Sequence, residues 1–174
     1  MLRKATRADV PAIARVMRES LRELGPGAYD EQQVTSSIEY VARPDSQLVD
    51  DGTYFVATVN DVIVACGGWS RRGKLYSGSA ADDGEARLLD PATEPARVRA
   101  MFVDPQFARR GLGRAILEAC EREAAAEGFR TVELMAMLSG EKMYLACGYV
   151  PIERVPVRLE DGVVIDCTRM QRPI

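Results

Sequence analysis

The chain has 174 residues, of which 47% are hydrophobic and 28% charged, and its formal net charge is −3. This length is typical of one domain, so we expect a single domain over residues 1–174. The slightly acidic balance argues against a nucleic-acid-binding protein, which normally carries a basic face. The chain lacks an 18-residue apolar run and an apolar stretch after Met1, so we expect a cytoplasmic protein with no membrane partner.

The first 44 residues predict a short strand and two helices. Leu2–Ala5 is a candidate strand, and the next four residues, ending at Asp9, resemble a capping box at a helix start. Apolar residues then recur at helical spacing from Val10 to Leu24, where Gly-Pro-Gly ends the pattern. Tyr29–Val41 predicts a second helix, which Pro44 cannot continue.

The middle of the chain predicts a hairpin followed by a long loop. Thr53–Val59 and Val62–Trp69 are rich in strand-forming residues and are joined by Asn-Asp, a two-residue turn signal. Arg71–Pro95 is loop-like, and Leu75-Tyr76 and Leu88-Leu89 could anchor it. About 25 residues is long for a connection. It is either a functional flap over a site or a tolerated surface insertion.

The stretch after this loop predicts a strand, a glycine-containing turn and a helix. Ala96–Val103 alternates in the manner of a strand, and Pro105 ends it. From Leu112 onward, apolar residues recur at positions 0, 3, 4, 7 and 8, which is one face of a helix. Gly111 and Gly113 lie at the start of that helix, where backbone N–H groups lack partners.

Such a turn predicts an anion site, most naturally for a phosphate or pyrophosphate. The helix start carries positive potential, and Arg109, Arg110 and Arg114 add to it. A dinucleotide fingerprint would need a third glycine where Ile116 stands. A P-loop would need Gly-Lys-Ser/Thr, which is absent.

The last third of the chain predicts the end of the preceding helix, one further short helix and three strands. Gly128 supplies a helix stop, and Thr131–Met137 is a strand of low polarity. Ser139–Cys147 predicts a short helix capped by Ser139. Tyr149–Val157 and Val163–Met170 predict a final hairpin around Glu160-Asp-Gly. The succession of elements indicates one mixed sheet with helices on both faces.

Residues 108–113 resemble motif A of the GNAT superfamily of acetyl-CoA-dependent N-acetyltransferases, Gln/Arg-x-x-Gly-x-Gly/Ala. Gly111 and Gly113 match the two small positions, whereas Ala108 departs from the leading Gln/Arg, with arginine displaced by one and two residues. The resemblance extends from about Leu2 to the end of the chain, except for the middle loop. It implies an α/β (mixed α+β) fold, with a central mixed, mostly antiparallel, twisted sheet of six or seven strands flanked by about four helices.

The resemblance also implies a cofactor site. The backbone of Met101, Phe102 and Val103 corresponds to positions that hydrogen-bond the pantetheine arm, like an added strand. The turn that holds the pyrophosphate corresponds to Arg109, Arg110, Gly111, Leu112, Gly113 and Arg114. Family members often place an asparagine before the next helix, and here that contact is missing or replaced by Ser139.

Met143-Tyr144-Leu-Ala-Cys-Gly-Tyr149 resembles the family segment Phe-Tyr-x-x-x-Gly-Phe, which places Tyr144 where the family's general acid lies. A phenol is protonated at neutral pH and can donate to a leaving thiolate. The alternative is a helix tyrosine that packs in the core. Tyr29 and Tyr40 could likewise contact substrate or pack.

The general base is left unassigned. Six acidic residues are candidates only by their place in the sequence, and a chain of water molecules is an alternative: Asp82, Asp83, Glu85, Asp90, Glu94 and Glu133. The chain has no histidine, and its four cysteines are far apart, so we expect buried, reduced thiols and no metal site: Cys66, Cys120, Cys147 and Cys167.

These observations predict an N-acetyltransferase with acetyl-CoA as co-substrate. It would acetylate a primary amine of a small molecule or peptide by direct attack in a ternary complex, and it could form a homodimer, as family members often do. The alternative of a different class is a non-catalytic acyl-CoA-binding sensor or regulatory module. A nucleotide-binding protein that uses the same turn is disfavoured because the P-loop lysine is absent.

Overall fold

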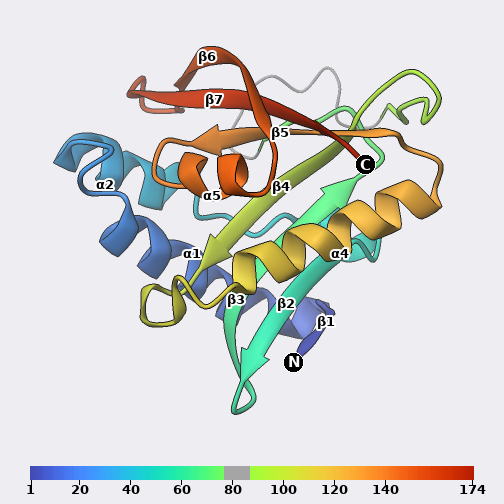
Figure 1. The fold of residues 1–174 in the computed structure, drawn as a ribbon. Helices are drawn as coiled ribbons and strands as arrows, with labels where there is room; N and C mark the ends of the chain where they lie inside the picture. Colours follow the sequence, from blue (N-terminus) through green and yellow to red (C-terminus); the bar gives the residue numbers. More distant parts are fainter. Residues whose placement is uncertain (77–86) are drawn as a thin grey trace.

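The computed structural model describes residues 1–76 and 87–174 (Figure 1). In this part of the chain seven strands form one sheet in the order β1-β2-β3-β4-β5-β7-β6. The strands are β1 (Leu2–Lys4), β2 (Tyr54–Val59), β3 (Val62–Ser70), β4 (Ala96–Val103), β5 (Thr131–Met137), β6 (Val150–Arg158) and β7 (Val164–Pro173). The helices are α1 (Val10–Leu24), α2 (Glu31–Tyr40), α3 (Ser46–Asp50), α4 (Leu112–Ala126) and α5 (Glu141–Ala146). The predicted fold class is therefore confirmed.

Local signals explain most of these boundaries. The Asp9 carboxylate accepts a hydrogen bond from the Thr6 amide at 2.8 Å, and a short 3-10 turn then leads into α1. Asp30 accepts from the amide of Gln33 and caps α2. Asn60 and Asp61 both have positive φ, 48° and 61°, as a two-residue hairpin turn requires.

The local structure departs from expectation at three points. Helix α3 was not foreseen, because five residues carry too little periodicity, although the Asp45 side chain caps it. Ser139 does not cap α5; Gly140 occupies that position, without a side-chain cap. Of the residues expected to anchor the loop, Leu89 is buried and Tyr76 packs in the cluster beside β6 and β7, whereas the Leu88 side chain is exposed.

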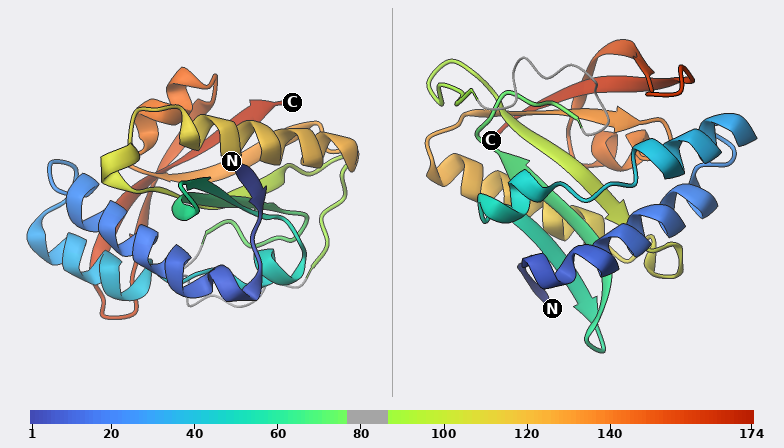
Figure 2. Two further views of the ribbon diagram at one scale, coloured as in Figure 1. Left: turned by 90° about the horizontal axis from the view of Figure 1, so that it is seen from below. Right: turned by 180° about the vertical axis from the view of Figure 1, so that it is seen from behind.

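The helices cover both faces of the sheet (Figure 2). On one face, α4 packs over a core that includes Trp69, whose ring meets Phe129 edge to face at 6.1 Å between centroids. On the other face, α1 and α3 pack over a core that contains Ile13, Leu48 and Tyr54. Trp69 is buried, and the burial predicted for the thiols is confirmed, except that Cys147 is half-buried. None of the described helices is long and apolar enough to cross a membrane.

The sheet opens between its two central strands. β4 and β5 form its parallel pair, and they are paired only from Ala96 opposite Val132 to Val98 opposite Leu134. Beyond Val98, β4 continues to pair with β3, while β5 continues to pair with β7. The β3–β4 register shifts near Ala100, which has a φ of +57°. The two strands therefore diverge, as Figure 1 shows, and the facing edge of β4 has no strand partner.

Candidate functional site

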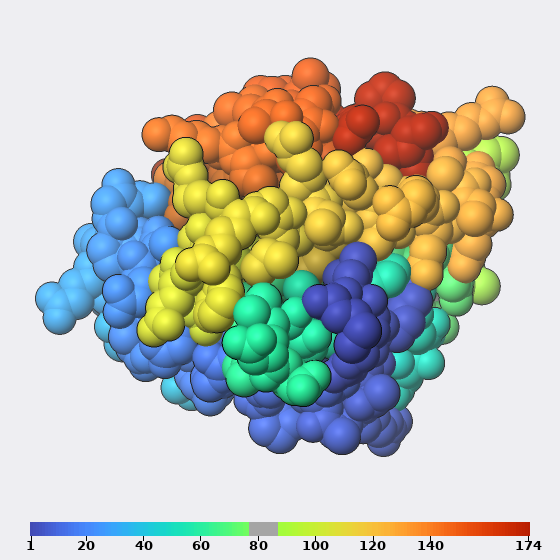
Figure 3. Space-filling view, turned by 60° about the horizontal axis from the view of Figure 1, so that its bottom comes forward, coloured from blue at the N-terminus to red at the C-terminus, as the bar shows by residue number. Residues whose placement is uncertain are grey.

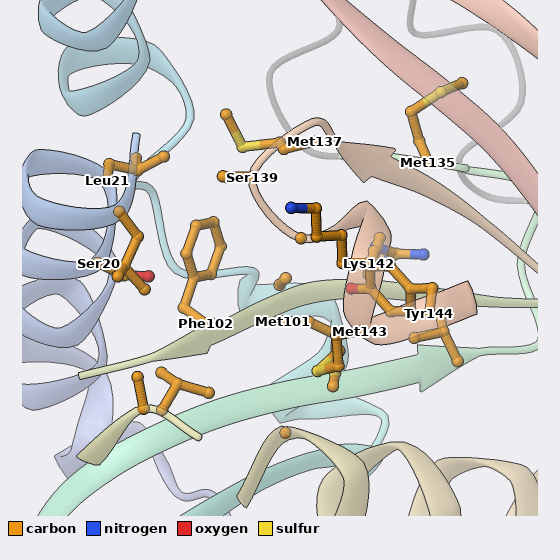
Figure 4. Close-up of a pocket in the computed structure, with 18 of the residues that line it drawn as sticks. Ser20, Leu21, Met101, Phe102, Met135, Met137, Ser139, Lys142, Met143 and Tyr144 are labelled. Carbon is orange, nitrogen blue, oxygen red and sulfur yellow. The ribbon is translucent and has the colours of Figure 1, made fainter. Parts of the chain in front are cut away.

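A cavity of about 740 Å³ lies where β4 and β5 diverge (Figure 4). Its lining comes from both faces of the sheet. Leu21 and Val41 belong to the side of α1 and α2, and Gly113 and Met143 belong to the side of α4 and α5. The cavity therefore passes through the sheet at its opening and gives two ligands a place to meet.

One end of the cavity is the turn between β4 and α4. Gly111 has a φ of +80° and precedes the first residue of α4, and Arg109 also lies in the left-handed region at +64°. The first helical bond runs from the Ala115 amide to the Gly111 carbonyl oxygen at 2.9 Å. The amides of Leu112, Gly113 and Arg114 therefore lack helical acceptors, so this turn can bind an anion through its backbone.

The two glycines of the turn are needed for different reasons. A Cβ atom at Gly111 would meet nothing within 4 Å, so the positive φ is what favours glycine there. A Cβ atom at Gly113 would lie 2.7 Å from the Met143 sulfur. Gly113 thus allows the start of α4 to lie close against α5.

Two of the three predicted arginines line the cavity. Arg109 and Arg114 do so, and the Arg114 guanidinium also lies 3.4 Å from the Ala146 carbonyl oxygen. Arg110 does not line it; its guanidinium lies over the ring of Phe107, 5.1 Å from the centroid. Figure 3 shows the turn and the start of α4, in yellow, at the molecular surface, where a large ligand can reach them.

The end of β4 forms the middle of the cavity. Met101, Phe102 and Val103 all line it. Phe102 packs toward the face of α1, while Met101 and Val103 pack toward the face of α4. Because the β5 side of this segment has no strand partner, its backbone groups can pair with an extended ligand. Ser139 also lines the cavity, beside Gly140.

Tyr144 projects into the same space from α5. Its side chain is buried and lines the cavity, and its ring meets Tyr149 edge to face at 5.9 Å between centroids. The Tyr149 hydroxyl donates to Glu121 at 2.9 Å, which holds that ring in place. The Tyr144 hydroxyl has no hydrogen-bond partner among the described residues.

Burial, followed by the nearby sulfurs of Cys120 and Cys147, raises the pKa of Tyr144 above its ordinary value. The side chain is therefore a protonated phenol at neutral pH, with a free hydroxyl in the cavity. That combination suits a proton donor.

The two other tyrosines considered as substrate contacts, Tyr29 and Tyr40, lie outside the cavity lining, whereas Tyr76 lines it. The Tyr29 hydroxyl donates to the Asp166 carbonyl oxygen at 2.7 Å and accepts from the Leu138 amide at 2.8 Å. It ties the end of β5 to β7. Tyr40 packs in the cluster beside β6 and β7, with Arg43 over its ring. Both positions agree with the packing alternative.

None of the described acidic candidates for a general base lines the cavity. Glu133 accepts from Arg97 at 2.8 Å and from Arg169 at 3.3 Å. The Arg87 guanidinium holds the pKa of half-buried Glu94 low, at about 2. The Asp90 carboxylate accepts hydrogen bonds from the Ala92 amide and the Thr93 hydroxyl of its own loop. The candidates Asp82, Asp83 and Glu85 lie outside the described residues.

The sequence did not reveal the wall opposite the turn. It is built from four elements and the residue that follows α2, and its side chains are mostly apolar: Leu21, Leu24, Val41, Met135, Met137, Val157, Ile165 and Cys167. Each of these residues resembles an ordinary core position in its own segment. Arg99, which also lines the cavity, was missed as well; its guanidinium forms a buried ion pair with Asp45 at 2.6 Å.

Comparison with known proteins gives a consistent result. The model of the acetyltransferase (GNAT) family matches residues 14–149, which is more than half of the chain. The comparison with curated proteins gave no match.

Several solved structures share the fold. A GCN5-related N-acetyltransferase from Rhodopseudomonas palustris is 19% identical, with a TM-score of 0.76 over 100% of this chain and 95% of that one. The PaiA N-acetyltransferase from Thermoplasma acidophilum, solved with coenzyme A, is 13% identical, with a TM-score of 0.67 over 100% and 98%. The putative acetyltransferase YncA from Salmonella typhimurium, solved with acetyl-CoA, is 18% identical, with a TM-score of 0.64 over 99% and 92%.

Proposed function

Because the chain belongs to the GNAT acetyltransferase family, we propose that it transfers the acetyl group of acetyl-CoA to a primary amine of a small molecule or peptide. The observation that carries this proposal is the continuous cavity through the sheet. It joins a turn with free backbone amides to a buried tyrosine with a free hydroxyl. Donor and acceptor can therefore approach from opposite faces.

Acetyl-CoA would occupy the side of α4 and α5. The amides of residues 111–114, together with Arg109 and Arg114, would hold the pyrophosphate. The pantetheine arm would extend along Met101–Val103 and pair with the free edge of β4. Two of the similar structures contain coenzyme A or acetyl-CoA, which supports this choice of ligand. The departure at Ala108 is compatible with such binding, because the backbone amides supply the main contacts.

The reaction needs no covalent enzyme intermediate. The neutral amine would attack the thioester carbonyl, so that a carbon–nitrogen bond forms and the carbon–sulfur bond breaks. The attacking nitrogen loses one proton, and the coenzyme A thiolate gains one. We assign the second transfer to the Tyr144 hydroxyl, which would act as general acid. Water in the cavity would take the proton from the nitrogen, since no described carboxylate lines it.

The alternative is a sensor that binds acyl-CoA without transferring the acyl group. The free Tyr144 hydroxyl and the large acceptor side of the cavity favour the enzyme, because a sensor requires neither. A sensor would bind acetyl-CoA and release no coenzyme A with any amine.

Calorimetric titration with acetyl-CoA, with ATP and NADH as controls, tests the cofactor assignment first. We expect a dissociation constant near 1 μM for acetyl-CoA, about −8 kcal/mol, and no comparable binding of the controls. A thiol-release assay with a mixed set of amines then separates enzyme from sensor. Preferential binding of ATP would refute the cofactor assignment.

A further inference from the structure

The acceptor half of the cavity has a distinct chemistry. It lies on the side of α1 and α2, beyond Phe102, and the β6–β7 hairpin closes it. Its wall consists mainly of aliphatic and sulfur-containing side chains, among them Leu21, Val157 and Ile165, and Ser20 and Tyr76 add two hydroxyl groups. Met135 and Met137 contribute flexible surfaces that adapt to different apolar shapes. Such a wall favours an apolar body next to the reacting amine.

The charged side chains of the lining near this half are cationic. Arg99 lines the cavity, as does the exposed Lys142 at the start of α5, and no acidic side chain does among the described residues. Figure 4 shows Lys142 reaching into the cavity from α5, on the side where Phe102 and Ser139 lie. Asp45, which pairs with Arg99, is itself buried and does not line the cavity. A second positive charge on the acceptor would meet repulsion from Lys142 and no described carboxylate in the cavity lining, since Asp45 is already paired with Arg99.

The polar groups of this half are also neutral or already engaged. Burial raises the pKa of the Cys167 thiol to about 11, so this side chain is uncharged at neutral pH. The Arg99 guanidinium bonds to Asp45 and to the Lys74 carbonyl oxygen at 2.9 Å. A charged group buried among such side chains would lose its hydration without gaining a partner.

We infer that the acceptor is an apolar primary monoamine, with an alkyl or aryl body and no second cationic group. This inference rests on the proposed function and names the substrate class of the same site. It favours simple hydrophobic amines over polyamines and over peptides that carry basic side chains.

The first test measures coenzyme A release by the full chain with matched amines. In the series from propylamine to hexylamine, kcat/KM should rise about three- to fourfold for each methylene until the cavity is filled. Hexylamine should exceed hexamethylenediamine, which has the same length and a second charge, by about tenfold or more. Equal or better turnover of the diamine would overturn the inference.

The same assay distinguishes failure of the substrate-class inference from failure of the proposed function. It includes hexamethylenediamine and a basic peptide with a free N-terminus alongside the monoamines. If either of these is the better acceptor, the substrate class is wrong while the proposed function stands. If no amine releases coenzyme A, although acetyl-CoA binds in the calorimeter, the proposed function itself fails.

A variant tests whether the wall sets the preference. Leu24 lines the cavity and is 40% exposed, so Leu24→Glu adds an acid at its rim with little disturbance of the core. The kcat/KM ratio of diamine to hexylamine should rise by up to about fivefold, the range of an exposed ion pair. Ile152→Glu is the control, because Ile152 is 45% exposed and does not line the cavity. An equal change in both variants would contradict the inference.

Discussion

The two sides of the opening between β4 and β5 are built in contrasting ways. The side of α4 draws the residues predicted to bind the cofactor mainly from one stretch, residues 101–114, and offers backbone groups and positive potential. The side of α1 and α2 collects its lining from four elements and the residue after α2, and offers mainly apolar side chains. In the proposed function, the first side binds the cofactor through backbone groups, and the second side selects the acceptor through side-chain shape and charge.

The two sides of the opening are expected to tolerate different substitutions. If the turn binds the cofactor through its backbone, as proposed, it should tolerate replacement of a side chain, such as Ala108 where the family has Gln or Arg. It should not tolerate a change in φ at Gly111. In the proposed acceptor wall, single substitutions should alter the preferred acceptor and leave cofactor binding intact.

The largest expected effect comes from breaking the turn. Gly111→Val forces a β-branched residue toward a φ of +80° and moves the amides that follow it. We expect acetyl-CoA affinity to fall on the order of a hundredfold or more, because several backbone contacts are lost together. Calorimetry measures the loss directly.

Gly162→Val is the matched control for this strain. Gly162 has a φ of +87°, lies in the β6–β7 turn, and does not line the cavity. This variant should lose comparable stability in a thermal melt and bind acetyl-CoA as the wild type does. Wild-type affinity in Gly111→Val would show that the pyrophosphate lies elsewhere.

The next largest effect tests the general-acid role proposed for Tyr144. Tyr144→Phe removes one hydroxyl and keeps the ring against Tyr149. We expect kcat to fall about a hundredfold, the usual contribution of a general acid, with acetyl-CoA affinity within about twofold of wild type. Steady-state kinetics and calorimetry give the two values.

Tyr149→Phe supplies the comparison for that variant. It removes a hydroxyl of the same kind, one that bonds to Glu121 and does not reach the cavity. Its kcat should stay near the wild-type value while its stability falls by about 1–3 kcal/mol, since buried Glu121 loses a partner. If both variants had the same kcat, Tyr144 would be a packing residue and no acid.

The sequence predicted the α4 side of the opening, whose residues lie close together in the chain. It missed the side of α1 and α2, whose residues come from separate segments. Residues 96–126 carry strand, turn and helix signals in order, so an anion site could be predicted from spacing. Nine of the ten residues predicted to bind the cofactor, several of them from the family resemblance, line the cavity. Arg110 is the exception, because sequence spacing does not show that its guanidinium lies over Phe107.

The acceptor wall could not be predicted for a physical reason. Val157 and Ile165 read as ordinary hairpin residues, and only the divergence of β4 from β5 exposes them to a cavity. That divergence depends on which strands pair, and pairing is a property of the whole sheet. The acidic candidates failed for the same reason, since position in the sequence gave no information on what each carboxylate faces.

The smallest effect concerns pH and tests the charge contrast between the two sides. Only the neutral amine attacks, and no described acid lines the acceptor side, so the rising limb of kcat/KM should follow the acceptor's own pKa. A less basic amine should shift that limb to lower pH. A limb that stays fixed when the amine is changed would instead reveal an enzyme base.

The alkaline limb of the pH profile tests Tyr144 as the general acid. A general acid works while protonated, and burial raises the pKa of Tyr144, so the active form is lost only as pH rises through that raised value. We therefore expect kcat to change less than about twofold up to about pH 10, the ordinary value for a phenol. A descending limb below that pH, present in the wild type and absent in Tyr144→Phe, would mean that the phenol is more acidic than its buried setting allows.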